Sequence, residues 1–251
     1  MAAPAVSSRN VLSNRRVLVI GVGGLGCPAL LALADSGATL VLADDDAVEL
    51  SNLHRQILFG EANVGTDKLS AAREALLRMG VSERRIELVR SRFLPENARE
   101  LVARADLVLE GSDNFATKFL AADACHLEGR PVVHGAAVRF LATAWCVSPK
   151  GRPCYRCLFE DVPADSAQTS CVEAGVMGPV VGLCGALMAE LALRTLLETT
   201  PPFGRIFTYD GRRDVLREVI VPARESCPLC GPAHAISEID ETRYTAPSCA
   251  A

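Results

Sequence analysis

An apolar run that ends in a glycine-rich turn constrains the fold of this chain more than any other feature. Residues 16–20 read RVLVI, and the turn GVGGLG follows at residues 21–26. The next apolar segment predicts a helix over about 25–35, and the run at 39–43 predicts a second strand. Two buried strands joined by a helix form a right-handed βαβ unit whose strands are parallel. The sequence therefore predicts an α/β fold with a Rossmann-like, mostly parallel sheet.

The alternation of helices and strands continues and then changes character. After residue 136, the segments 139–148 and 205–221 have strand character, with turn residues at Gly151 and at Asp210-Gly211. We expect them to be antiparallel strands that continue the same sheet. Before that point we expect helices at 68–79, 95–103 and 114–128, and strands at 86–90, 107–110 and 131–136.

Composition and charge exclude several classes of protein. Of the 251 residues, 49% are hydrophobic, and the net charge is −4 without a long basic run, so nucleic-acid binding is not expected. No signal peptide is visible at the N-terminus. The apolar stretch 175–197 contains Glu190 and Arg194, which predicts a buried helix at an interface rather than a membrane span. With ten cysteines and no secretion signal, we expect a cytoplasmic protein.

Four of the cysteines form two closely spaced pairs. Cys154 and Cys157 lie in PCYRC, and Cys227 and Cys230 lie in CPLC. Two intervening residues allow both thiolates of a pair to reach one metal ion, and two such pairs complete a tetrahedral Zn²⁺ site. Two disulfides, or unrelated cysteines, are the alternatives. Zn²⁺ is favoured because both pairs lie in loops rich in Gly and Pro and nothing marks the chain as secreted. We expect a structural site.

The glycine turn between strand and helix predicts a nucleotide site. The glycines at Gly21, Gly23, Gly24 and Gly26 allow a tight turn and the close approach of a phosphate to the helix N-terminus. Asp44, at the end of the second strand, can accept hydrogen bonds from ribose hydroxyls. These residues alone fit NAD as well as ATP.

Polar and cationic side chains after Asp44 favour a triphosphate. Asn52, Arg55 and Gln56 follow the acidic cluster, and Lys68 begins the next helix. Such side chains balance the charge of the phosphates and of a leaving pyrophosphate. Asp113 follows the fourth strand at the edge of the sheet where ligands bind, and a carboxylate beside a triphosphate is a candidate Mg²⁺ ligand. Each charge alone could be ordinary surface charge, so the prediction depends on the whole set in this order.

The same residues resemble the MoeB/ThiF/HesA family, the ubiquitin-activating-enzyme-like adenylyltransferases. The resemblance extends from about Arg16 to Cys230 in the family's order. It is closest to the molybdopterin-synthase adenylyltransferase branch, which keeps both cysteine pairs. The matching segments are VLVIGVGGLGCPAL, ADDDAVELSNLHRQ, VGTDKLSAAREAL, SDN, PCYRC, TSCVEAGVMGP and CPLC.

The resemblance implies ATP-dependent adenylation of the C-terminal glycine of a small ubiquitin-fold sulfur-carrier protein ending in Gly-Gly, with release of pyrophosphate, in molybdopterin, thiamine or a related biosynthesis. It implies an adenylyltransferase domain over residues 1–231, with a nucleotide-binding half at 16–136 and a carrier-binding and zinc half at 137–231. A polar tail at 232–251 follows. It also implies a homodimer.

Carried over to this sequence, the resemblance gives each site residue a role. The glycine turn holds the nucleotide and Asp44 the ribose; Asn52, Arg55 and Lys68 bind phosphates, Asp113 binds Mg²⁺, and the four paired cysteines bind Zn²⁺. Cys171 matches the family cysteine that in some members links covalently to the carrier or carries sulfur, and an inert loop thiol is the equal alternative.

The chain departs from the family pattern in two respects. Many members begin with an R-Y-x-R-Q-type segment that delivers an arginine to the partner protomer's ATP site. No such motif precedes Arg16; Arg9 and Arg15 are the only nearby candidates. No rhodanese sequence follows Cys230, so we expect a separate sulfur donor.

Three alternatives remain open. An NAD(P)-linked oxidoreductase shares the glycine turn but has no use for Arg55, Lys68 and Asp113 together. A non-catalytic subunit that docks a ubiquitin-like partner would explain the missing arginine. The same chemistry could also act on a ribosomal peptide, because fold and site set the reaction more than the partner.

Overall fold

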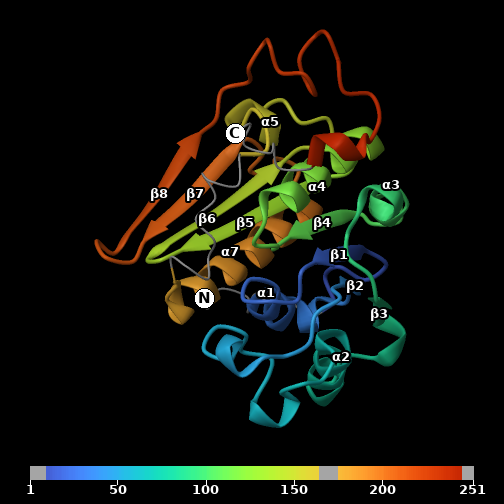
Figure 1. The fold of residues 1–251 in the computed structure, drawn as a ribbon, viewed down its shortest axis with the longest axis vertical. Coiled ribbons are helices and arrows are strands. Elements are labelled where there is room, and N and C mark those ends of the chain that lie inside the picture. Colours follow the sequence, from blue (N-terminus) through green and yellow to red (C-terminus); the bar gives the residue numbers. More distant parts are fainter. Residues whose placement is uncertain (1–9, 164–174, 245–251) are drawn as a thin grey trace, which may run out of the picture.

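The computed structural model describes residues 10–163 and 175–244 of the chain. Its centre is one eight-stranded sheet in the order β3-β2-β1-β4-β5-β6-β7-β8 (Figure 1). The pairs from β3 to β5 are parallel, and those from β5 to β8 are antiparallel. The strands are β1 (Arg16–Ile20), β2 (Thr39–Ala43), β3 (Ile86–Val89), β4 (Leu107–Glu110), β5 (Val132–Val138), β6 (Leu141–Val147), β7 (Arg205–Asp210) and β8 (Val215–Ile220).

Helices cover both faces of the parallel half of the sheet. Along β1, Val17 and Val19 face one apolar core, and Leu18 and Ile20 face the other. Helices α1, α2 and α7 pack in the first core, and α3 and α4 in the second. The helices are α1 (Gly26–Leu33), α2 (Lys68–Arg78), α3 (Pro95–Ala103), α4 (Phe115–Glu128), α5 (Tyr155–Leu158) and α7 (Gly178–Leu197), with 3₁₀ turns η1 (Ala34–Ser36), η2 (Leu50–Asn52), η3 (Glu61–Asn63), η4 (Glu83–Arg85) and η6 (Glu241–Tyr244).

The predicted mixed sheet is confirmed, with one local difference at the hairpin between β5 and β6. The sequence predicts a strand from residue 139, whereas β5 continues to Val138 and β6 begins at Leu141, its partner across the hairpin. Arg139 adopts a φ of 54°, in the left-handed region, and so turns the chain. Pairing across this two-residue turn extends β5 beyond the apolar run that the sequence shows.

Helix α7 is the buried helix predicted from the apolar stretch. It has 20 residues and a mean hydropathy of 1.8 in its most apolar window, enough by length and composition to cross a membrane. In the fold it packs against α1, β5 and β6, as Figure 1 shows. Its Met188 and Ala189 are buried in the core that these elements share. Because 44% of this window is buried, packing against the sheet accounts for the apolar residues on one side of the helix.

The described part of the C-terminal segment packs on the domain. Residues 232–251 were expected to form a polar tail, yet Ile236 and Tyr244 are buried in the core beside α4. The Tyr244 hydroxyl donates to Asp123 Oδ2 at 3.0 Å. Asp123 also accepts two hydrogen bonds of 2.8 Å from Arg156, which lies between the two cysteines of the PCYRC segment. These contacts tie the segment to α4 and to the cysteine region.

Candidate functional site

The carboxyl ends of the parallel strands border a cavity of about 590 Å³. Its wall includes residues that directly follow β1, β2 and β4, as expected for a ligand site in an open α/β sheet. Its size is that of a small-molecule site. Of the predicted nucleotide and phosphate residues, the lining contains Gly21, Gly23, Gly24, Asp44, Asn52, Arg55, Gln56, Lys68 and Asp113.

The glycine turn between β1 and α1 allows close backbone approach. Gly21 has a φ of 85°, which favours glycine. A Cβ on Gly26 would lie 2.1 Å from the carbonyl oxygen of Gly21, so this position admits no side chain. A Cβ on Gly23 would meet nothing nearer than Gln56 Nε2 at 3.7 Å, so the turn is open toward the cavity there. Gly26 closes the turn but does not line the cavity.

Asp44 and Lys68 form a charged pair beside the turn. Asp44 accepts hydrogen bonds from the backbone N–H of Val22 at 2.7 Å and of Asp46 at 2.9 Å. Lys68 Nζ lies 4.0 Å from Asp44 and 2.7 Å from Asp46. Burial raises the pKa of Asp44, and the Lys68 charge opposes this. The backbone bonds fix the orientation of the Asp44 carboxylate at the end of β2.

The start of α2 positions Lys68. Asp67 caps this helix by accepting from the backbone N–H of Ser70 at 3.0 Å. The Lys68 backbone N–H donates to the Asp46 carbonyl at 3.0 Å, and Ala47 bridges to Asp67. Lys68 is buried, with 5% of its surface exposed. These contacts hold its ammonium group at the wall of the cavity.

Asn52, Arg55 and Gln56 lie on the loop that follows β2. Arg55 donates to Asn52 Oδ1 at 2.5 Å. Gln56 is buried and lines the cavity, and its Oε1 has no hydrogen-bond partner among the described residues. A Cβ on Gly178, at the start of α7, would lie 2.3 Å from the His54 carbonyl oxygen. The close packing of α7 therefore sets the distance of this loop from the glycine turn.

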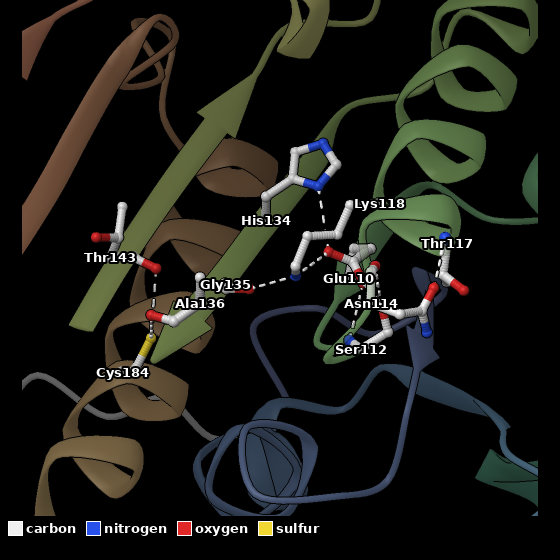
Figure 2. A network of polar contacts seen from close by, with 10 residues as sticks. All are labelled: Glu110, Ser112, Asn114, Thr117, Lys118, His134, Gly135, Ala136, Thr143 and Cys184. Atoms are coloured by element: carbon white, nitrogen blue, oxygen red, sulfur yellow. Dashed lines mark hydrogen bonds and ion pairs between the residues drawn. The ribbon is translucent and has the colours of Figure 1, made fainter. Parts of the chain in front are cut away.

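Asp113 lies in a turn after β4 that a buried glutamate organises. Glu110 is fully buried, and its Oε1 accepts from the backbone N–H of Ser112 at 2.8 Å and from the Ser112 hydroxyl. Asn114 then caps α4 by accepting from the backbone N–H of Thr117 at 2.8 Å (Figure 2). Asp113, between these anchors, is exposed and lines the cavity.

Glu110 also connects to a lysine and a histidine that the sequence analysis did not assign to the site. Lys118 Nζ, from α4, lies 2.7 Å from Glu110 Oε2 and donates to the Gly135 carbonyl at 2.6 Å. His134 Nδ1 lies 3.3 Å from the same Glu110 oxygen (Figure 2). Burial would raise the pKa of Glu110, but Lys118 and His134 outweigh it and lower that pKa to about 2. Burial lowers the pKa of His134, so at neutral pH a carboxylate lies between an ammonium and a neutral imidazole.

Sequence signals for these residues exist in retrospect. Glu110 ends an apolar strand. Lys118 lies in helix α4, and the seven residues that follow it in the sequence are all buried. A charged residue inside an apolar run is rarely buried unless it is paired. His134 has no comparable signal, because its partner Glu110 lies on a different strand.

Aromatic side chains form one end of the cavity. We call His134, Trp145, Tyr155 and Phe159 the aromatic recess; all four line the cavity. The Tyr155 ring lies 4.6 Å from that of His134, 5.9 Å from that of Trp145 and 4.9 Å from that of Phe159, measured between centroids. Sequence analysis missed this feature because its members come from β5, β6, α5 and the residue that follows α5.

The four paired cysteines lie together, and none of them lines the cavity. Their sulfur atoms all lie within 4.8 Å of one another. Cys154 Sγ lies 3.5 Å from Cys227 Sγ, and Cys157 Sγ lies 3.4 Å from Cys230 Sγ. These distances are too long for disulfides, and all four are free thiols. The structure thus brings together the four cysteines that the spacing selected. Cys171 lies outside the described residues.

Comparison with known proteins gives relatives along the whole chain. The sequence model of the ThiF family matches residues 3–229. An adenylyltransferase and sulfurtransferase MOCS3 of Dictyostelium discoideum is 37% identical over 95% of this chain, which spans only 57% of that relative. The SAMP-activating enzyme E1 of Haloferax volcanii is 39% identical, with 95% of this chain and 88% of that protein covered. The sulfur carrier protein ThiS adenylyltransferase of Escherichia coli is 37% identical, with 92% of each covered.

A solved structure agrees with the fold. Escherichia coli MccB, crystallised with MccA-N7isoASN, superimposes with a TM-score of 0.76 at 21% identity, covering 89% of this chain and 69% of that one. At this identity the likeness concerns the fold alone. The family match and the relatives above 30% identity carry the assignment: this chain belongs to the ThiF family.

Proposed function

We propose that this protein adenylates the C-terminal glycine of a small ubiquitin-fold sulfur carrier at the expense of ATP. The relatives named as adenylyltransferases and as a SAMP-activating enzyme support this reaction class. One observation carries the proposal: a single cavity collects the glycine turn, the cationic side chains and Asp113. An NAD(P)-linked reaction would leave Arg55, Lys68 and Asp113 without a role.

The residues of the cavity suit a triphosphate. The open face at Gly23 leaves room for a phosphate against the N-terminus of α1. The unpartnered Oε1 of Gln56 is a buried acceptor that a bound nucleotide can satisfy. We assign ribose binding to Asp44, and phosphate binding to Asn52, Arg55 and Lys68. Asp113 would hold Mg²⁺, which would balance charge on the phosphates.

In the proposed reaction the carrier's terminal carboxylate attacks the α-phosphorus of ATP. A bond from the carboxylate oxygen to phosphorus forms, and the bond between the α-phosphorus and the bridging oxygen breaks. Pyrophosphate leaves with that electron pair. Arg55 and Lys68 stabilise the negative charge that develops on the leaving group, because their positions are fixed before the reaction.

Pyrophosphate exchange tests this function. Labelled pyrophosphate should enter ATP only in the presence of Mg²⁺ and a carrier with a C-terminal Gly-Gly. Suitable probes are the E. coli sulfur carrier ThiS and a SAMP protein, the carriers named for two relatives. Carriers lacking the last two glycines are the matched control. Exchange without any carrier, or none with either intact carrier, would count against the proposal.

The relatives leave the pathway open between molybdenum cofactor, thiamine and related biosynthesis.

We propose that Cys154, Cys157, Cys227 and Cys230 bind one structural Zn²⁺. Tetrahedral Zn²⁺ with Zn–S bonds of about 2.3 Å places its sulfurs about 3.8 Å apart, close to the spacing of the two cross-pairs, 3.5 and 3.4 Å. Four thiolates would leave no open coordination position. The site would therefore fix the start of α5 to the loop that follows β8.

Metal analysis tests this site. It should find about one zinc per chain, and chelation should lower the melting temperature before it changes nucleotide exchange. Cys227→Ser should reproduce the loss of stability, and a chelator should have no further effect on that variant. A zinc-free preparation with an unchanged melting temperature would show the assignment to be wrong.

For Cys171 we propose that adenylation does not need the thiol. Cys171→Ala should therefore keep both pyrophosphate exchange and downstream sulfur loading of the carrier. Intact-mass analysis of enzyme, carrier and MgATP decides the alternative. A carrier adduct that is sensitive to thiols in the wild type and absent from Cys171→Ala would instead make Cys171 a nucleophile.

We further propose a homodimer, a separate protein as the sulfur donor, and a cytoplasmic location. Eight described cysteines are free, which suits a reducing compartment. Sedimentation analysis would test the dimer. Residues 1–231 would form the adenylyltransferase domain, with the nucleotide in the half at 16–136 and the carrier on the half at 137–231.

A further inference from the structure

Two buried polar atoms of the aromatic recess have no hydrogen-bond partner. Nε2 of His134 and Nε1 of Trp145 are buried and unpaired among residues 10–163 and 175–244. Of the two side chains, only 4% and 2% of the surface is exposed, and both line the cavity. Leaving a buried donor or acceptor unpaired is unfavourable, because the group has lost its hydrogen bonds to water. Because both border the same cavity, a ligand that satisfies them would recover that cost.

The two atoms have opposite hydrogen-bonding roles. Glu110 is ionised and can only accept, so the proton of the neutral His134 ring lies on Nδ1, which faces Glu110 (Figure 2). Nε2 of His134 is then an acceptor. Nε1 of Trp145 is always a donor. The recess therefore offers one acceptor and one donor.

The spacing and the walls of the recess select a flat, narrow ligand. His134 and Trp145 are direct partners across β5 and β6, and their ring centroids lie 6.5 Å apart. Tyr155 lies against both rings. In an extended chain, the N–H and C=O of one residue point to the same side. A single extended residue without a side chain therefore presents the matching donor and acceptor to this pair.

The order of strands along the sheet places the recess relative to ATP. Asp44 follows β2, the glycine turn follows β1, Asp113 follows β4, and His134 lies on β5. A nucleotide with its ribose at Asp44 and its phosphates at the turn leaves β5 and β6 on the far side of the phosphates. In an in-line displacement the carboxylate approaches the α-phosphorus opposite the leaving pyrophosphate. The substrate's terminus must therefore lie along the part of the cavity wall that the nucleotide leaves free, and the aromatic recess belongs to that wall.

We propose that the aromatic recess binds the N–H and C=O of one glycine in the C-terminal Gly-Gly of the protein substrate. The substrate N–H donates to His134 Nε2, and the substrate C=O accepts from Trp145 Nε1. Glu110 acts as a positioning residue that fixes the His134 tautomer. This role rests on the proposed function, and it makes His134 and Trp145 the residues that bind the C-terminus of the substrate.

Trp145 provides the first test because it is the only tryptophan in the chain. The probe is a ubiquitin-fold carrier with any tryptophan replaced by Phe. Its addition should change the fluorescence of the wild-type enzyme in a saturable way. The same carrier without its last two glycines should cause no such change, and neither should MgATP alone. A change caused by MgATP alone would place the nucleotide in the recess and overturn the proposal.

Kinetics provide the second test. Trp145→Phe removes the donor but keeps an aromatic ring, and should raise the carrier KM in pyrophosphate exchange about 5- to 20-fold. The KM for ATP and the kcat at saturating carrier should stay unchanged. Tyr209→Phe is the matched control, because it removes one hydroxyl from an aromatic residue of β7 outside the cavity.

Substrate chemistry separates His134 from a general packing effect. N-methylation of the last or the penultimate glycine removes an N–H donor, and at one of these positions it should raise the carrier KM for the wild type. His134→Phe should raise the KM for the unmodified carrier but make the enzyme insensitive to that methylation. The proposal would be overturned if, at both glycines, the increase in KM from methylation added to the increase from His134→Phe. An unchanged carrier KM in Trp145→Phe would also overturn it. Absence of exchange with the wild type would instead remove the proposed function itself.

Discussion

Asp113, the proposed Mg²⁺ ligand, lies in the turn that follows β4. It is exposed, whereas Glu110 and Asn114 on either side of its turn are anchored. We expect Asp113→Ala to abolish pyrophosphate exchange, because the metal ligand is lost. The melting temperature should change little, since exposed substitutions usually cost less than about 0.5 kcal/mol. Exchange assays and thermal unfolding measure the two effects.

Asp45→Ala is the control for this prediction. Asp45 is another exposed carboxylate of the cavity wall, and its removal should leave most of the activity. Equal losses in both variants would contradict a role that is specific to Asp113.

The buried pair of Glu110 and His134 should make the fold sensitive to acid. Burial lowers the pKa of His134 from 6.5, and Lys118 and His134 lower that of Glu110 from 4.5 to about 2 despite its burial. Below these reference values the unfolded chain binds protons that the native state does not. Stability is therefore complete above pH 6.5 and falls as the pH decreases, on the order of 3 kcal/mol from Glu110 by pH 2.

Urea unfolding between pH 7 and pH 3 would measure this dependence. In His134→Gln, the free energy of unfolding should decrease less between pH 7 and pH 5, the range in which His134 contributes. Its decrease below pH 4.5, to which Glu110 contributes, should remain. Parallel curves for the wild type and the variant would contradict the assignment of the upper range to His134.

At the scale of elements, the glycine turn lacks side chains for two separate reasons: close backbone packing at Gly26 and the approach of a phosphate at Gly23. Gly26→Ala would place a methyl group 2.1 Å from the Gly21 carbonyl, so the turn must shift, at a cost of about 1–3 kcal/mol. Gly23→Ala meets only ordinary contacts and should change stability by less than about 0.5 kcal/mol. It should still weaken ATP binding, because its methyl group lies where the phosphate approaches.

Urea unfolding measures the stability of each variant, and calorimetric titration with MgATP measures its affinity for ATP. The expected pattern is a stable Gly23→Ala protein with poor ATP affinity, beside a destabilised Gly26→Ala protein. Normal ATP affinity in Gly23→Ala would mean that the phosphates do not lie on this turn.

At the scale of the whole molecule, the described part of the C-terminal segment packs against α4 and stabilises its position. Removal of residues 232–251 takes away the buried side chains of Ile236 and Tyr244, which should cost on the order of 2–4 kcal/mol. Pyrophosphate exchange should persist, because residues 232–244 do not line the cavity. Tyr244→Phe, which removes only the hydrogen bond to Asp123, should cost about 1 kcal/mol. An unchanged free energy of unfolding after the truncation would show that the segment is detached in solution.

The sequence by itself determined the mixed α/β sheet and the part of the cavity wall that contains the glycine turn, Asp44 and Asp113. Apolar runs mark buried parallel strands, and polar side chains follow where those strands end, so the place of Asp44 and Asp113 in the cavity wall could be predicted from their order in the sequence. The spacing within each cysteine pair likewise selected the four sulfurs that lie together.

Only the tertiary structure decided which residues meet across elements. Glu110, Lys118 and His134 come from β4, α4 and β5, and their pairing depends on how α4 packs on the sheet. The aromatic recess and the packing of Tyr244 against α4 depend in the same way on contacts between segments far apart in the chain. Local patterns carry the period of a helix or strand, whereas these contacts depend on strand register and helix packing, which no short segment of sequence encodes.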